Sequence, residues 1–516
     1  MTQFHHVHWD SLIVGYDFST GGVKALAFTP NGHVAAKIKL PTDLWTAGGV
    51  SELNLMQLEG QARAATRLIA LELDNISATS QWAAVGISAT HHTAGLIDAF
   101  GNQIRRAICW NDQTLAQYHA EGLKRLGGQE RAKELTGGPW AVRYSLSHLV
   151  KDEATLSPEE WQRTQHMLPH GPLAAGYLTG RFDVTSVSSA ASTGIMDLRT
   201  NQWCKEMLGA IENPAYRELA WDNLPEILDM NTPIGPLTEH IAELFGGVRP
   251  LVFPTLDDQA AGLLGGGAVD AGHVAIILGN SAVVNSSSAA LPHSGTLDAM
   301  KLNWGPYLWM RCYSNGAQFL DRVVGANSDW AALEAAGRKV APLCDGVSLI
   351  PFALSEPSIG IEEPWFEWVG GEPADPGVRV RASFEALAYL IALGVREHEA
   401  AGQKVTRVTV SGGIAKSDLM CDILASALGR EVERLVSDEG TALGAAVVAL
   451  AGLEQSGRTA KGIAEPFTVA DAVSAMVKFR PEPAKPNAGW VAEYRKGLAA
   501  FEARLATKKK SAGPPS

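Results

Sequence analysis

The same short pattern occurs near the N-terminus and again after the midpoint of the chain, and this repeat restricts the possible folds. Residues 12–28, LIVGYDFSTGGVKALAF, contain an apolar stretch, a turn of hydroxyl residues and glycines, and a second apolar stretch. Residues 273–288, HVAIILGNSAVVNSSS, repeat the pattern around Gly279, Asn280 and Ser281. Apolar runs bounded by Gly and Asn predict strands joined by tight turns. The sequence therefore predicts an α/β fold with a duplicated domain that forms two lobes.

Length and connector composition predict how the chain is divided. With 516 residues the chain is too long for one hydrophobic core, so two domains are expected. Connectors that contain proline and glycine, at 231–237 and 245–250, place the division near residue 250. The C-terminal residues predict a packed helix followed by a disordered basic end, KKKSAGPPS. The expected parts are an N-terminal domain (1–250), a C-terminal domain (251–480) and a tail (481–516).

Composition and charge exclude several classes of protein. The chain is 46% hydrophobic and 19% charged, as in ordinary globular proteins, and its net charge of −12 argues against a nucleic-acid partner. The most apolar run falls short of the roughly 20 residues that a membrane span needs, and the N-terminus does not resemble a signal peptide. The five cysteines are dispersed without a CxxC pair, which is typical of reduced thiols. We therefore expect a cytoplasmic protein that does not contact membranes.

The first turn has residues suited to binding a cation and phosphate. Asp17 ends an apolar strand and is followed at once by Ser19, Thr20 and Gly21. A carboxylate in this position suits a hydrated cation, and the backbone N–H groups of the turn suit phosphate oxygens. The segment lacks the GK[ST] ending of a Walker A motif. An ordinary hairpin turn remains the alternative interpretation.

Two adjacent histidines follow the next buried strand. Residues 82–88, WAAVGIS, predict a strand, and His91 and His92 come directly after it. In α/β folds, ligands bind at the carboxyl ends of strands. An imidazole can both donate and accept hydrogen bonds, so either histidine could contact a polar ligand. The alternative is that both are structural residues without a ligand.

Two adjacent carboxylates, Asp257 and Asp258, come at the end of the apolar segment LVFPT and precede Gln259 and several small residues. Small residues allow a substrate to approach the backbone closely, and a desolvated carboxylate in such a place can serve as a general base. The alternative is that one of the two simply caps the helix that begins at Gln259. A further strand, turn and helix follow over 405–420, with Gly412 and Gly413 at the turn.

Taken together, these segments resemble the FGGY carbohydrate kinases, and within them the xylulokinase-like branch. The resemblance runs from about residue 12 to about residue 452, and the segments occur in the family's order. The matching segments are GYDFSTGGVKA, GISATHHTAGLIDAFGNQIRRAICWND, LPHGPLAAGYLTG, DDQAAG, LGNSAVV, SGGIAKS and EGTALGAAVVALAG.

The resemblance implies two actin-like, RNase H-like ATPase domains with the active site in the cleft between them. It also implies ATP and Mg²⁺ as cofactors, and transfer of the γ-phosphoryl group to a hydroxyl of a ketopentose such as D-xylulose. The N-terminal domain would hold the sugar and the first phosphate loop, and the C-terminal domain the nucleotide. A homodimer is common among such kinases.

The resemblance also implies roles for individual residues. By position in the motifs, Asp258 matches the catalytic base, Asp17 matches the acid that holds hydrated magnesium, and His92 matches a histidine that contacts the sugar. The remaining matches are His91 and Gln259 beside the sugar, Thr20 and Gly21 in the first phosphate loop, Gly279, Asn280 and Ser281 in the second, and Gly412 and Gly413 at the adenosine.

Several positions depart from the family pattern. Asp257 stands where the family has glycine, and Thr90-His91 replaces Gln-Met before the sugar histidine. Asn280 replaces the threonine of the second phosphate loop, Thr114 replaces an arginine, and Ser189 replaces an aspartate. The predicted base, the magnesium acid and the glycine turns are kept, so catalysis is expected, whereas the changes near the sugar leave its identity open.

Other functions fit some of these residues. Another ketose or an alditol, such as ribulose or an erythritol-like compound, could be the substrate. A sugar-binding regulator that has lost turnover would also keep the site residues. A nucleotide-dependent chaperone or filament protein would share the fold, but it would hydrolyse ATP without any sugar.

Overall fold

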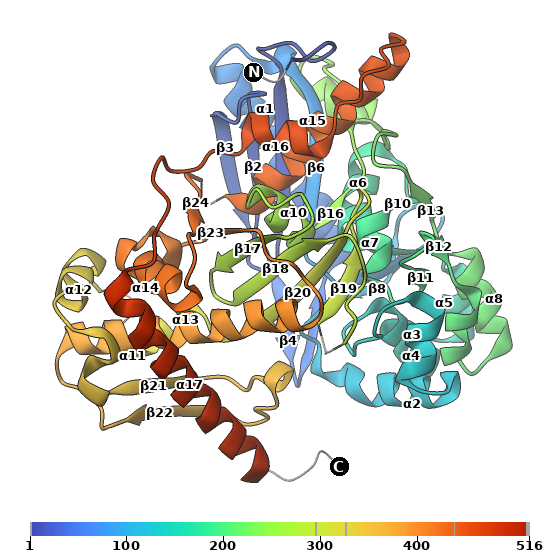
Figure 1. Cartoon of the computed structure of the whole chain (residues 1–516). Helices are drawn as coiled ribbons and strands as arrows, with labels where there is room; N and C mark the ends of the chain where they lie inside the picture. The colour runs from blue at the N-terminus through green and yellow to red at the C-terminus, as the bar shows by residue number, and fades with distance from the viewer. Residues whose placement is uncertain (1–2, 295–296, 326–327, 438, 512–516) are drawn as a thin grey trace.

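The computed structural model describes residues 3–294, 297–325, 328–437 and 439–511, and it contains two large mixed sheets (Figure 1). The first is seven-stranded, with the order β14-β15-β6-β1-β2-β3 and with β16 also paired to β6. Its strands are β1 (Leu12–Phe18), β2 (Gly22–Phe28), β3 (Val34–Pro41), β6 (Trp82–Ala89), β14 (Gly235–Pro236), β15 (Leu251–Val252) and β16 (Leu256–Asp257).

Strand β1 is central in this sheet because its residues are apolar on both faces. All of its residues are buried, and it pairs antiparallel with β2 and parallel with β6. A strand covered on both faces is expected to be a continuous hydrophobic run. Strand β3 is instead partly exposed and carries Lys37 and Lys39, as is common for edge strands.

The second sheet is six-stranded and repeats this arrangement, in the order β19-β20-β18-β17-β23-β24. Strands β17 and β18 form an antiparallel hairpin like β1 and β2, and β23 runs parallel to β17 as β6 does to β1. The predicted duplication is therefore confirmed. The strands are β17 (His273–Leu278), β18 (Ala282–Ser288), β19 (Asp298–Lys301), β20 (Tyr307–Tyr313), β23 (Arg407–Ser411) and β24 (Glu433–Arg434).

The first half of the chain also contains a smaller five-stranded sheet and a group of helices. The sequence from about Leu115 to Trp161 has a helical pattern broken at Gly127-Gly128 and Gly137-Gly138, and the structure has helices separated at both glycine pairs. The sheet contains β4 (Leu44–Ala47), β5 (Val50–Leu53), β7 (Ala94–Ile97), β8 (Gln103–Ile108) and β9 (His166–Pro169); the helices are α1 (Leu55–Asn75), α2 (Ala116–Leu126), α3 (Gln129–Thr136), α4 (Ser145–Thr155), α5 (Pro158–Arg163), α6 (His170–Thr179), α7 (Val187–Ala191), α8 (Pro214–Asp222) and α9 (Glu239–Ala242).

Helices of the second half cover the second sheet and also reach the first. The long helix α13 packs on α14, and the C-terminal helix α17 lies along α14 (Figure 1). The bounds are α10 (Asp258–Gly265), α11 (Ala317–Val324), α12 (Trp330–Gly337), α13 (Pro376–Ala400), α14 (Asp418–Leu428), α15 (Gly440–Ala460), α16 (Val469–Met476) and α17 (Ala488–Ser511), with the hairpin β21 (Ser348–Phe352) and β22 (Trp365–Val369) beside them.

Three details differ from the sequence expectations. Residues 251–257 still add strands to the first sheet, so this sheet ends a few residues beyond the division expected at 250. The segment 179–198 is rich in Ser, Thr and small residues, a composition that predicts a loop and hairpin, yet it contains helix α7. The start of the expected disordered end is helical, because α17 continues to Ser511; residues 512–516 lie outside the described residues.

Helix α15 belongs to the second half of the sequence but packs on β1 and β6 of the first sheet (Figure 1). Glycines make this close contact possible. A Cβ atom on Gly15 or Gly86 would lie 1.9 Å from the carbonyl oxygen of Ala442 or Ala445, respectively. On the helix itself, a Cβ atom on Gly444 would lie 1.9 Å from a backbone oxygen of α10. The two halves are therefore joined through backbone contacts that exclude side chains.

Among the described residues, no helix combines the length and the apolar character that crossing a membrane would require.

The glycine contact predicts a stability difference between two substitutions. We expect Gly86→Ala to destabilise the protein by about 3 kcal/mol, because its methyl group would meet backbone that cannot rotate away. Gly60→Ala is the matched control: Gly60 is an exposed residue within α1, and a Cβ atom there would meet no other atom within 4 Å, so alanine should stabilise by about 0.5–1 kcal/mol. Urea denaturation of both variants measures the difference. Equal stabilities would contradict the packing described.

Candidate active site

Three parallel strands of the first sheet bring their carboxyl ends together. Ser88 on β6 lies opposite Asp17 on β1 and opposite Leu256 on β16. The segments that follow these strands therefore leave the sheet at one edge, and the Thr90 N–H donates to the Phe18 carbonyl at 3.0 Å. The turn after Asp17, the two histidines and the Asp257-Asp258 pair, which are far apart in sequence, thus lie beside one another.

Asp257 caps helix α10. One of its carboxylate oxygens accepts from the N–H groups of Gln259 at 3.0 Å and Ala260 at 2.8 Å. Its other oxygen accepts from the hydroxyl of Ser188, on α7. An N-cap satisfies backbone donors that have no partner within the helix. The capping alternative is therefore correct for Asp257, and Asp258 remains available for another role.

Asp258 is the first residue of α10, and few groups bind its carboxylate. The His91 N–H donates to Oδ1 at 3.3 Å, and the Gln259 side-chain amide donates to the same oxygen at 3.4 Å. Burial raises the pKa of Asp258 to about 8, and the nearby charges of Asp257 and Asp17 contribute to this rise. A carboxylate with a pKa near neutrality holds a proton more strongly than an ordinary aspartate, which is a property of general bases.

The two histidines form a buried stack with Tyr144. The rings of His91 and His92 lie 3.6 Å apart between centroids, and those of His92 and Tyr144 lie 4.4 Å apart, all nearly parallel. His92 has a φ of 52°, a conformation that is rare for residues with a side chain and occurs at functional sites. Burial lowers the pKa of both histidines, so the imidazoles are neutral at pH 7.

The hydrogen bonds of His92 define which nitrogen carries the proton. Nδ1 lies 3.0 Å from the Ser192 carbonyl, which can only accept, so Nδ1 must donate. Nε2 then has a lone pair and no partner, although it is buried. Among the described residues, none hydrogen-bonds to either ring nitrogen of His91. Buried polar atoms without partners are uncommon and indicate a ligand site.

Asp17 has the properties of a carboxylate that binds a hydrated cation. It is buried, its Oδ1 has no partner, and burial raises its pKa. Thr441 at the start of α15 bonds its side chain, and beside it Lys24 pairs with Glu439 at 2.6 Å. Oxygen ligands with retained water are what Mg²⁺ prefers. The residues present therefore fit the expected magnesium ion.

The glycine turns of the second sheet also lie together. Ile277 on β17 lies opposite Ser411 on β23, so the turn Gly279–Ser281 is adjacent to Gly412 and Gly413. Gly412 has a φ of 95°, and a Cβ atom there would lie 2.3 Å from the Leu278 carbonyl oxygen. Backbone held this close offers N–H groups to phosphate or nucleotide oxygens.

In the first sheet, Thr20 and Gly21 form the tip of the turn after β1, and a Cβ atom on Gly21 would meet no other atom within 4 Å. The flanking Ser19 closes this turn, because its N–H and its hydroxyl both donate to the Gly22 carbonyl. The tip of this turn therefore has space for a ligand.

Sequence reasoning missed several residues of this region. Gly316 follows β20 and lies against the Gly279 turn, where a Cβ atom would be 2.5 Å from the Gly279 oxygen. Asn285 donates to the Gln259 side-chain oxygen at 3.1 Å and so orients that amide. The SNG triplet before α11 was a detectable turn signal, whereas Tyr144 and Ser188 lie in segments with no distinctive pattern.

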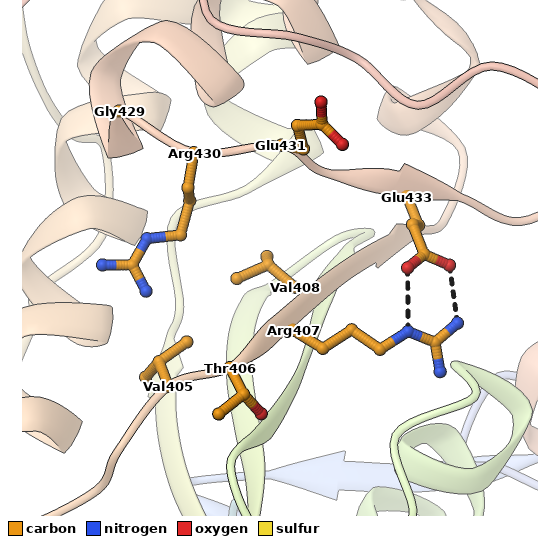
Figure 2. Close-up of a pocket in the computed structure, with 8 residues that line it drawn as sticks. All are labelled: Val405, Thr406, Arg407, Val408, Gly429, Arg430, Glu431 and Glu433. Atoms are coloured by element: carbon orange, nitrogen blue, oxygen red, sulfur yellow. Dashed lines mark hydrogen bonds and ion pairs between the residues drawn. The ribbon is translucent and has the colours of Figure 1, made fainter.

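A separate pocket of about 480 Å³ lies at the opposite end of β23 from the Gly412 turn (Figure 2). In it Arg407 forms a bidentate ion pair with Glu433, at 2.6 and 2.9 Å. This pocket contains none of the predicted site residues. It is lined by Val405, Thr406, Arg407, Val408, Gly429, Arg430, Glu431 and Glu433.

Two protein-family models match this chain. The model of the N-terminal domain of the FGGY family of carbohydrate kinases matches residues 12–265, and that of the C-terminal domain matches residues 370–453. Fold and matches together define a phosphotransferase with two actin-like ATPase domains, as the sequence predicted. The chain belongs to the FGGY family of carbohydrate kinases.

Individual relatives differ in their substrates. Xylulose kinase of Escherichia coli K12 is 26% identical over 453 residues, which cover 85% of this chain and 89% of that protein. Glycerol kinase of Paraburkholderia xenovorans is 25% identical over 465 residues, with the same coverage of 85% and 89%. The crystal structure of xylulose kinase from Rhodospirillum rubrum superimposes with a TM-score of 0.81 at 22% identity, covering 96% of this chain and 98% of that one.

The cap predicts how substitutions of Asp257 affect stability. We expect Asp257→Ala to destabilise the protein by about 1–2 kcal/mol, because two backbone N–H groups and the Ser188 hydroxyl lose their acceptor. Asp257→Asn is the matched control and should be nearly neutral, since asparagine caps helices as well as aspartate. Urea unfolding measures both. Equal losses in the two variants would contradict the capping role.

Proposed function

We propose that the protein is an ATP- and Mg²⁺-dependent kinase that phosphorylates a hydroxyl of a ketopentose such as D-xylulose, with Asp258 as the general base. The observation that carries this proposal is the environment of Asp258. Its carboxylate is poorly hydrogen-bonded, its pKa is raised to about 8, and it lies beside Asp17 and the histidine stack. The similarity to xylulose kinases supports the choice of sugar class.

Each site residue has a defined task in this proposal. Asp258 accepts the proton of the attacking sugar hydroxyl, Nε2 of His92 accepts a hydrogen bond from another hydroxyl, and Gln259 contributes its amide. In the other lobe, the backbone of Gly279–Ser281 and of Gly412-Gly413 binds ATP. Magnesium held near Asp17 supplies charge neutralisation on the phosphates. Phosphoryl transfer depends mainly on such positioning and on exclusion of water when the lobes close.

A second candidate substrate is an alditol, and one observation favours it. Glycerol kinases are similar to this chain over the same fraction of its length and with nearly the same identity as xylulose kinases. An ADP-release assay across pentuloses, hexuloses and alditols distinguishes the candidates. A sugar-binding regulator would release no ADP with any of them.

Location and assembly complete the proposal. We propose a cytosolic enzyme, because all five cysteines are free thiols, as is usual in reducing compartments. A homodimer is proposed from the family resemblance alone. Sedimentation equilibrium measures the assembly state.

Replacing the proposed base should abolish most turnover without weakening the binding of the sugar. We expect Asp258→Asn to lower kcat by about 10²–10⁴-fold while the dissociation constant of the sugar changes little. In the unchanged enzyme, kcat/KM should rise with pH and level off above about 8, because the free enzyme is active only when Asp258 has lost its proton.

Asp257→Asn is the matched control for this experiment. It keeps the cap but removes a charge that raises the pKa of Asp258, so kcat should be largely retained and the pH profile should move to lower pH. Retained kcat in Asp258→Asn, with loss in Asp257→Asn, would transfer the base role to Asp257.

Removing His92 should weaken sugar binding selectively. We expect His92→Ala to weaken the sugar by about 1–3 kcal/mol, because a sugar hydroxyl loses its acceptor, while ATP affinity is unchanged. Tyr144→Phe is the control, since it keeps the ring that stacks on His92 and removes only the hydroxyl. Calorimetric titration of both ligands measures the effect. Equal weakening of sugar and ATP, or of neither, would contradict the sugar contact.

A further inference from the structure

His91, Asp257 and Asp258 form a cluster that the proposed sugar kinase reaction does not explain. Each residue offers one ligand atom, and these atoms all lie within 4.8 Å of one another. Nδ1 of His91 is 3.8 Å from Oδ1 of Asp257. The His91 side chain is only 5% exposed, and neither ring nitrogen has a hydrogen-bond partner. A buried imidazole that faces two carboxylates without a hydrogen bond to either is an arrangement in which one bound ion would satisfy all three groups.

The donor set has the chemistry of a transition-metal site. One neutral imidazole and two carboxylates are ligands that Zn²⁺ and similar dications bind. An imidazole binds a metal through the lone pair of its neutral form. Mg²⁺ prefers oxygen ligands and retained water, so the oxygen environment of Asp17 and this cluster select different ions.

Asp257 can take part without losing its cap. A carboxylate has about four lone-pair positions, two on each oxygen. Oδ1 accepts both cap bonds and Oδ2 accepts one bond from Ser188, so the remaining acceptor position of Asp257 is on Oδ2. Asp258 accepts only two long hydrogen bonds, at 3.3 and 3.4 Å, so its carboxylate has free acceptor positions. Bonds of about 2.0–2.2 Å to one ion require the ligand atoms to move together by about 1 Å.

Two residues of this cluster depart from the family pattern given above. His91 stands where the family motif has methionine, and Asp257 stands where it has glycine. A methionine–glycine pair would leave Asp258 as the sole carboxylate at this point, without an imidazole beside it. The two departures lie far apart in sequence, yet their side chains face each other across 3.8 Å.

We propose that His91, Asp257 and Asp258 bind one divalent transition metal ion such as Zn²⁺, and that this ion excludes the sugar by occupying Asp258. The binding part of this proposal is independent of the kinase activity. The inhibitory part rests on the proposed function, in which Asp258 must be free to accept a proton. The site would make the enzyme sensitive to zinc at concentrations that do not affect its use of magnesium.

Direct zinc titration in excess Mg²⁺, without sugar or ATP, tests the binding. His5, His6 and His8 near the N-terminus could bind zinc adventitiously, so the experiment uses a background in which all three are alanine. Competition with a chromophoric zinc chelator gives stoichiometry and affinity, and Co²⁺ in place of Zn²⁺ gives a visible spectrum that reports its ligands.

We expect one zinc ion per chain, bound at least about 10-fold more weakly in His91→Met, which restores the family residue. His91→Gln is a second variant that keeps a polar side chain, and it should show the same loss. Thermal unfolding without metal verifies that both variants are folded. An unchanged zinc affinity in both variants, or no zinc binding to the background protein, would overturn the proposal.

The inhibitory part has its own measurement. Zinc should raise the KM of the sugar and leave the KM of ATP unchanged in the background protein. In His91→Met, the same rise in the KM of the sugar should require at least about 10-fold more zinc. Zinc inhibition that raises the KM of ATP instead of the KM of the sugar would overturn the assignment of the site. If no sugar supports ADP release, the proposed function fails, while the zinc titration still decides whether the ion binds here.

Discussion

The contact on which the rest of the structure depends is the backbone packing of α15 against β1, β6 and α10. Gly15, Gly86 and Gly444 allow carbonyl groups to lie where side chains would otherwise be. Because α15 is held so closely, Thr441 and Glu439 at its start reach Asp17 and Lys24 in the first sheet. A helix from the second half of the sequence thereby becomes part of the first lobe, and one core cluster contains residues from both halves.

The adjacent acids at the start of α10, Asp257 and Asp258, have identical side chains but different environments. Asp257 ends a strand and caps the helix, where backbone and hydroxyl donors stabilise its charge. Asp258, one residue later, is desolvated by burial and has two neighbouring carboxylates and only weak donors, so its pKa is raised. Since its pKa in the folded state is above the ordinary value, the folded state binds this proton more tightly than the unfolded chain. Its contribution to stability therefore decreases as the pH rises from about 4 through about 8.

Much of this arrangement could be predicted from the sequence, because the signals are local. Buried strands followed at once by Asp17, by His91-His92 and by Asp257-Asp258 predict where these residues leave the sheet, and the register confirms it. The glycine turns of the second sheet are equally local. Contacts made across long sequence separations could not be predicted. Ser188 lies in a segment with no distinctive pattern, so its hydrogen bond to Asp257 could not be predicted. That α15 crosses to the other lobe has no signature in its apolar pattern, which fits any buried helix.

The fixed tautomer of His92 determines which kind of hydrogen-bonding group this part of the site can bind. Because the Ser192 carbonyl holds the proton on Nδ1, Nε2 can receive a hydrogen but cannot offer one. On the proposed function, a ligand must therefore present an O–H at this point. A deoxyfluoro sugar of the same shape presents fluorine, which has no hydrogen to give, and would face the lone pair of Nε2 with its own. The imidazole thus distinguishes a hydroxyl from an isosteric fluorine by the polarity of the bond, without any change in the size of the pocket.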